Sequence, residues 1–188
     1  PILIAISYRQ KMAKRVLVGG VSYLTLPFFS LLWLYEGEGG RALVLLIFLS
    51  VWVVDVFAFL AGKSIGGAKL APKISPNKTW AGLIGGVLAA FILGTVYPLF
   101  TDILSPLQAG LLCVVMAVLA QGGDLFESAL KRKAGVKDSG NILPGHGGLL
   151  DRMDGLVMAA MGAGVIALCV SLFQPSSPAQ MIELFRLW

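Results

Sequence analysis

The chain has 188 residues, of which 57% are hydrophobic and only 13% are charged, and its formal net charge at pH 7 is +5. Its mean hydropathy of +0.84 lies well above the usual range of soluble globular domains. The composition therefore excludes an ordinary soluble domain and predicts an all-α integral membrane protein. Residues 1–7 (PILIAIS) are typical of the end of an apolar segment, not of a signal peptide, so we expect further spans before them.

Five apolar stretches are each close to the roughly 20 residues that a helix needs to cross a hydrocarbon core of about 30 Å. They cover residues 17–35, 42–61, 83–100, 107–121 and 155–173. We therefore expect residues 1–188 to form a single membrane-embedded domain, a polytopic bundle of about five helices with two long loops on one side.

Small residues within these spans predict close helix packing. Gly82 and Gly86 stand four apart, and so do Ala160 and Gly164. Cys113 and Cys169 each lie in an apolar run without metal-binding spacing, so we expect packing roles for both and neither a zinc site nor a disulfide.

Basic residues lie almost entirely on one side of the expected membrane. All of the 15 lysines and arginines except Arg41 and Arg186 precede the first span or follow the second or the fourth. The positive-inside rule predicts that this side is cytoplasmic.

The first long loop on that side, Gly62–Trp80, contains four lysines and no acid. Lysine binds phosphate as a point charge, and glycine turns let backbone amides reach an anion. The loop therefore suits a phosphate ligand, although its lysines can equally set topology and contact anionic headgroups.

The second loop, Gln121–Asp154, interleaves acids and bases around the only histidine of the chain. We expect Asp124 to begin a helix after two glycines, and Asp151 and Asp154 to project to one side at the start of the last span. Paired carboxylates suit a hard divalent cation that also binds substrate phosphate. The alternative is a solvated loop with weak surface ion pairs.

Two further residues stand out. Asp55 lies within the second span, where an ionisable group usually faces a cavity or a partner, so it can belong to a substrate pocket or serve a structural lysine. His146 has glycines on both sides and suits contact with a phosphate, and we assign it no role as a general base.

The same residues resemble the signature of a known family. Ser128, Lys131-Arg132, Lys137-Asp138, Pro144, His146-Gly147-Gly148, Asp151-Arg152 and Asp154 are similar to the signature of the CDP-diglyceride synthetases, also called phosphatidate cytidylyltransferases, and Ser75–Gly82 resembles their other recurring segment. Ala81 departs from the pattern, because members often carry an acidic or amide side chain there.

The resemblance implies a reaction in which CTP and phosphatidic acid give CDP-diacylglycerol and pyrophosphate, with Mg²⁺ and optionally a second, monovalent cation such as K⁺. It implies that Asp124, Asp151 and Asp154 hold the metal and that Lys137 and Asp138 belong with them to the catalytic set. The groups expected to bind the phosphates of CTP are Lys73, Ser75, Lys78, Lys131, Arg132, His146 and Arg152, together with Lys137.

A phosphomonoester oxygen is already a nucleophile, so this chemistry needs positioning and charge neutralisation rather than a catalytic base. The expected partners are CTP, phosphatidic acid and membrane lipids, with no nucleic acid, and a homodimer is compatible with the small-residue helix faces. The expected location is the bacterial inner membrane, with the site facing the cytoplasm.

Three other functions compete with this interpretation. A CTP-dependent polyprenol or dolichol kinase acts on an alcohol, which calls for a general base. A transporter carries polar residues near the midplane of several spans, whereas here Asp55 is the main charged residue inside one. A purely structural membrane subunit does not require the acids and bases of residues 124–154.

Overall fold

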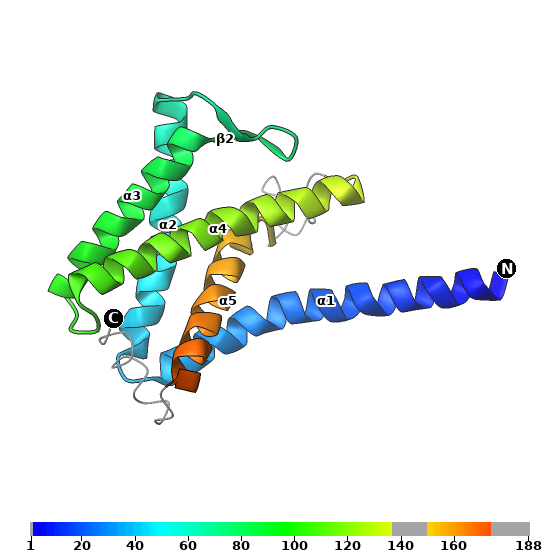
Figure 1. Cartoon of the computed structure of the whole chain (residues 1–188), viewed down its shortest axis with the longest axis horizontal. Helices are drawn as coiled ribbons and strands as arrows, with labels where there is room; N and C mark the ends of the chain where they lie inside the picture. The colour runs from blue at the N-terminus through cyan, green and yellow to red at the C-terminus, as the bar shows by residue number, and fades with distance from the viewer. Residues whose placement is uncertain (1, 137–149, 174–188) are drawn as a thin grey trace.

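The computed structural model describes residues 2–136 and 150–173, and for residues 2–13, 15, 16, 150–152 and 173 it describes the backbone alone. The elements are α1 (Ile2–Glu36), α2 (Gly40–Ser64), β1 (Lys69–Ala71), β2 (Ser75–Thr79), α3 (Trp80–Val96), the short 3₁₀ helix η1 (Tyr97–Leu99), α4 (Pro106–Ala134) and α5 (Leu150–Phe173). Figure 1 shows them in chain order by colour.

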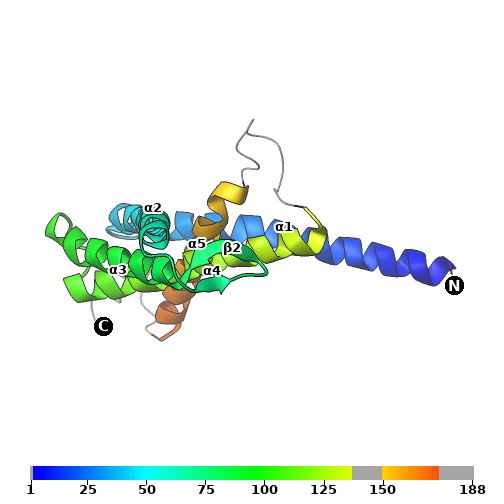
Figure 2. The ribbon, with the colours of Figure 1, turned by 90° about the horizontal axis from the view of Figure 1, so that it is seen from above.

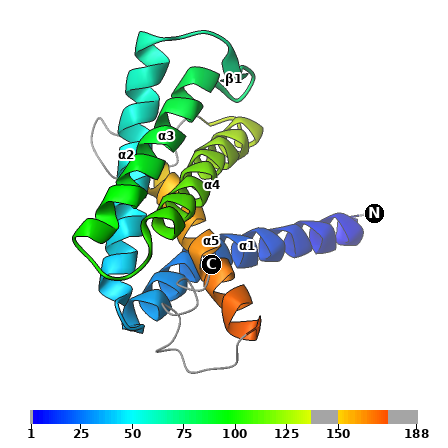
Figure 3. The same cartoon turned by 60° about the vertical axis from the view of Figure 1, so that its left-hand side comes forward.

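The five long helices confirm the prediction of an all-α polytopic membrane protein for the described part of the chain. The segments long and apolar enough to cross a membrane are Leu17–Glu36, Gly40–Ser64, Trp80–Leu99, Pro106–Ala134 and Met153–Leu172. The N-terminal half of α1 projects away from the other helices in all three whole-chain views (Figures 1, 2 and 3).

The pair α2 and α3 packs closely because glycines line their contact (Figure 3). A Cβ at Gly82 would lie 2.7 Å from the carbonyl oxygen of Ala58, and a Cβ at Gly86 would lie 3.0 Å from that of Val54. The predicted role of these glycines in packing is confirmed. Gly164 of α5 likewise contacts Ser30 of α1, and Ala160 is fully buried.

The expected first loop contains a β-hairpin. β1 and β2 pair antiparallel, with Lys69 opposite Thr79 and Ala71 opposite Ser75. Thr79 then caps α3, because its side-chain oxygen accepts a hydrogen bond from the backbone N–H of Gly82 at 3.1 Å. The hairpin lies on the α4 side of the α2–α3 pair, as the view from above shows (Figure 2).

α4 differs from the prediction. Its N-terminus is set by a capping box of Ser105 and Gln108, and it continues without a break to Ala134. The prediction that Asp124 begins a new helix after two glycines is wrong. Gly123 sits inside α4 because a Cβ there would lie 2.6 Å from the carbonyl oxygen of Asp154 on α5, so this glycine permits helix packing and not a turn.

The core lies between α2, α4 and α5, where Met116 and Cys113 of α4 are fully buried. The packing role expected of Cys113 is therefore confirmed, whereas Cys169 is exposed on α5. Both are free thiols, as expected.

Candidate active site

A pocket of about 390 Å³ lies where the end of α2, the hairpin and the middle of α4 meet. Its polar lining comes from Asp55 and Lys63 of α2, Asn77, Lys78 and Thr79 of β2, and Gln121 and Asp124 of α4. The rest of the wall is small or apolar, with Ala58, Phe59, Gly62, Gly82 and Leu83. A mainly apolar cleft with a few convergent polar groups is the usual form of a small-molecule site.

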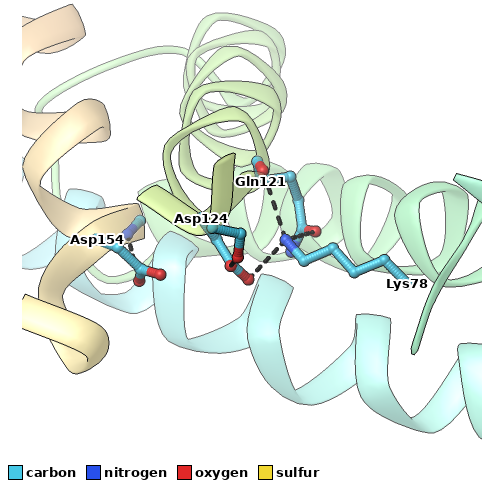
Figure 4. Close-up of polar contacts among 6 residues, drawn as sticks. Lys78, Gln121, Asp124 and Asp154 are labelled. Carbon is cyan, nitrogen blue, oxygen red and sulfur yellow. Dashed lines mark hydrogen bonds and ion pairs between the residues drawn. The ribbon is translucent and has the colours of Figure 1, made fainter. Parts of the chain in front are cut away.

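Lys78 and Asp124 form a short ion pair at the pocket. The Lys78 Nζ lies 2.6 Å from Asp124 Oδ2, and the side chains are 17% and 37% exposed respectively. Lys78 also donates to Gln121 Oε1 at 2.9 Å (Figure 4). The structure thus joins a residue of each predicted loop, and it does so through a lysine that β2 directs toward α4.

The Asp124 carboxylate is further oriented along its own helix. Ser128 donates from its hydroxyl to Asp124 Oδ1 at 3.3 Å, one turn later on α4. Asp124 and Ser128 therefore share one face of α4. Each carboxylate oxygen has a partner, so the group is held in one orientation.

Two more carboxylates lie near this pair. Asp55 is within electrostatic range of Asp154, Asp124 and Lys78. Asp154, near the start of α5, accepts a hydrogen bond from the N–H of Gly155 at 2.7 Å, and in Figure 4 Asp124 lies between it and Lys78. Asp55 lines the pocket and also interacts electrostatically with Lys78, so its role stays a prediction.

The other predicted site residues divide into three groups. Lys73, Ser75, Lys131 and Arg132 are described and do not line the pocket; Lys131 instead lies 3.6 Å from Glu127. Asp151 and Arg152 belong to the first turn of α5, but only their backbone is described. Lys137, Asp138 and His146 fall outside the described residues.

Sequence reasoning missed two residues at this place. Gln121 appeared only as the end of a span, yet its side chain is 6% exposed and contacts Lys78. Glu127 is 3% exposed and lies near Asp154. The spacing of three between Gln121, Asp124 and Glu127 was the available signal, because residues three apart share a helix face.

The carboxylates around the pocket are the candidate metal ligands of the described residues. Among the described residues, no three histidine, cysteine, aspartate or glutamate side chains are close enough to hold one ion together. Asp124 and Asp154 nevertheless provide hard oxygen donors that interact electrostatically, and the oxygens around Lys78 Nζ already stabilise a cation there. This donor chemistry fits a divalent cation that takes its remaining ligands from water or phosphate.

The fold and the pocket define a class: a polytopic membrane protein with an acid-and-lysine site at one end of its helices. Comparison with known proteins gives the family, because residues 3–171 match the model described as the cytidylyltransferase family. The chain belongs to that family.

Curated relatives agree with the assignment. The chain is 42% identical over 148 residues to the phosphatidate cytidylyltransferase of Rickettsia bellii (strain RML369-C), covering 75% of this chain and 64% of the relative. It is 46% identical over 121 residues to that of Brucella abortus biovar 1 (strain 9-941), covering 64% and 45%. The chain thus spans less than two thirds of the length of these relatives.

Proposed function

We propose that the protein transfers CMP from CTP to phosphatidic acid, giving CDP-diacylglycerol and pyrophosphate for phospholipid synthesis. The observation that carries the proposal is the cluster of Lys78, Gln121 and Asp124 in a pocket between membrane helices, in a chain of the cytidylyltransferase family. Relatives with 38–46% identity carry the name of this activity.

The reaction is an in-line displacement at phosphorus. A phosphate oxygen of phosphatidic acid attacks the α-phosphorus of CTP, a new P–O bond forms, and the bond to the β-phosphate oxygen breaks to release pyrophosphate. The attacking oxygen is already anionic, so the site has to align the two anions and neutralise their charge.

The acidic residues serve as the proposed metal ligands. Asp124 and Asp154, together with Asp151 three residues before Asp154, would hold Mg²⁺, optionally with a monovalent cation such as K⁺. When bound, a divalent ion neutralises charge on the phosphates and orients them. Asp124 would therefore face a cation on one side and the Lys78 ammonium on the other.

The basic residues supply the proposed phosphate contacts. Lys78 is the cation that already lies in the pocket, and Lys63 lines the same pocket from α2. Lys73, Ser75, Lys131, Arg132, Lys137, His146 and Arg152 remain proposed substrate contacts, and Asp138 remains a proposed member of the catalytic set.

The proposed setting is a bacterial inner membrane, with the pocket on the cytoplasmic side. Most basic residues flank the ends of the helices where the hairpin lies, as the positive-inside rule requires for a cytoplasmic face. Phosphatidic acid keeps its tails in lipid while CTP is in water, so their phosphates meet at such an interface. A homodimer is also proposed.

The test uses the complete gene product purified in detergent, with phosphatidic acid, Mg²⁺ and CTP labelled in the cytidine or at the γ-phosphate. We expect cytidine label to enter the lipid extract and to disappear when a chelator removes the metal. γ-Phosphate label entering an added polyprenol would instead identify a lipid kinase. Absence of metal-dependent transfer to either lipid would overturn the enzymatic proposal and favour transport or a structural role.

A further inference from the structure

Gln121 is a buried polar residue on α4, the longest of the described segments that are apolar enough to cross a membrane. It lies one turn before Asp124 on α4, and its side chain is only 6% exposed. Burying an amide costs free energy unless it finds a hydrogen-bond partner. The hydrogen-bond partner of the Gln121 side chain therefore indicates the role of this residue.

That partner is Lys78, 43 residues away in the chain. Gln121 accepts hydrogen bonds from Lys78 Nζ through Oε1 at 2.9 Å and through its backbone oxygen at 3.4 Å. Asp124 Oδ2 lies 2.6 Å from the same nitrogen. A lysine ammonium has three donors: Asp124 Oδ2 and Gln121 Oε1 take two of them at short distance, and the third, on the long contact to the backbone oxygen, is the one that a phosphate oxygen can take over (Figure 4).

We propose that Gln121 is a positioning residue, which holds the Lys78 ammonium where the phosphates of the nucleoside triphosphate bind. This inference rests on the proposed function. A lysine side chain loses rotamer freedom when it binds an anion, and that loss is smaller if the ammonium is already held in place. Gln121 thus acts through Lys78 and needs no contact with the substrate.

The neutrality of the amide is part of the argument. Asp124 already balances the charge of Lys78, and Asp55 and Asp154 lie near this pair, so a further carboxylate beside the ammonium would make the place more negative. A net negative charge repels a triphosphate. Glutamine supplies the acceptor that fixes the lysine without adding that charge.

The test is a double-mutant cycle on the complete gene product in detergent, with Gln121→Met, Lys78→Met and the double variant. Methionine keeps the length of glutamine and removes the acceptor. We expect Gln121→Met to raise the KM for CTP roughly tenfold with a smaller change in kcat, as loss of a hydrogen bond to a charged group does. In the Lys78→Met background the same change should have no further effect on KM.

Two variants complete the design. Leu111→Met, at an exposed position of the same helix, controls for a new methionine on α4 and should leave KM unchanged. Gln121→Glu keeps the acceptor and adds the charge, so we expect it to raise the KM for CTP at least as much as Gln121→Met. It also carries the test if Gln121→Met does not survive purification.

The outcomes separate this inference from the proposed function. A wild-type protein that transfers cytidine label, while Gln121→Met and Gln121→Glu keep its KM, overturns the inference alone. Additive effects of Gln121→Met and Lys78→Met also overturn it, because Gln121 would then act independently of the lysine. A wild-type protein without cytidylyl transfer overturns the proposed function itself.

Discussion

The acidic and the basic side of the pocket differ in how closely the elements that carry them are packed. The acids belong to long helices: Asp124 to α4, a capped helix of 29 residues that packs against both α3 and α5, Asp55 to α2 and Asp154 to α5. The basic side belongs to a hairpin of two short strands, whose Lys69 and Lys73 are exposed. Lys78 connects the two sides by its contacts with Gln121 and Asp124.

This difference in packing favours different roles for the two sides in binding a metal ion and a nucleotide. Helix packing presets the carboxylates, so a metal ion would find Asp124 and Asp154 already near one another. The hairpin has few tertiary contacts, so it can adapt to an arriving nucleotide at less cost than α4 can. Substitutions at Asp124 and Gly94 test the acidic side, and substitutions at Lys78 and Thr79 test the hairpin.

The largest effect is expected at Asp124. Asp124→Asn keeps the size of the side chain but removes its negative charge. This charge pairs with Lys78, and the carboxylate is a proposed metal ligand. We expect turnover to fall roughly 100-fold or more, in line with the loss of a group that stabilises charge in the transition state. Initial rates of cytidine transfer at saturating substrates measure the effect.

The control for this variant is Asp102→Asn, which makes the same chemical change between η1 and α4, away from the pocket. It should retain turnover. Asp124→Asn should also unfold in detergent near the wild-type temperature. Activity of Asp124→Asn close to that of the wild type would contradict the role given to this carboxylate.

The packing that holds the acidic side can be broken at Gly94. A Cβ on this α3 residue would lie 2.7 Å from both the carbonyl carbon of Ala109 and the Cα of Gly110 on α4. We expect Gly94→Ala to destabilise the protein by about 2 kcal/mol, because backbone atoms cannot move aside as a flexible side chain would. A lower midpoint of thermal unfolding in detergent would show it.

Gly20→Ala is the matched control, because a Cβ at Gly20 meets no atom within 4 Å. It should leave the midpoint unchanged. Equal midpoints for Gly94→Ala and Gly20→Ala would mean that α3 and α4 are not packed as closely as the structure has them.

The helices could be predicted from the sequence because burial in lipid imposes length and hydrophobicity on each span. The extent of α4 could not, because Gly122 and Gly123 are typical of a break. Gly123 serves a helix contact with α5 that only the three-dimensional arrangement reveals. Local pattern alone cannot separate these two uses of glycine.

The candidate site shows the same limit. Charge and spacing singled out Lys78 and Asp124 separately, but nothing in a linear sequence indicates that these two, and not Lys73 or Lys131, meet. The role of Gln121 could not be predicted, because a neutral amide at the end of a span forms no distinctive sequence pattern. Its importance comes from burial and from a partner 43 residues away.

The next effect is expected at the lysine that joins the two sides. Lys78→Met should raise the KM for CTP roughly tenfold while leaving kcat less changed, because it removes the proposed charged contact to the phosphates. Lys73→Met, a matched change at an exposed lysine of the same hairpin, should raise KM about twofold at low salt and hardly at all at 0.15 M salt.

The salt dependence discriminates between two roles for these lysines. An exposed charge that attracts the nucleotide from a distance is screened by salt, whereas a buried contact is screened much less. An unchanged KM in Lys78→Met would mean that this lysine only sets topology or balances Asp124.

The smallest effect is expected at Thr79, where the hairpin joins α3. Its side chain is 4% exposed and caps the helix by accepting from the Gly82 N–H at 3.1 Å. Thr79→Val keeps the shape and removes the acceptor, so it should cost about 1 kcal/mol of stability, while Thr79→Ser keeps the cap. Thermal unfolding in detergent should therefore rank Val below Ser. A larger loss in Thr79→Ser than in Thr79→Val would assign the role of Thr79 to methyl packing instead. Because Lys78 immediately precedes this cap, a higher KM for CTP in Thr79→Val than in Thr79→Ser would show that the cap also helps to place the lysine.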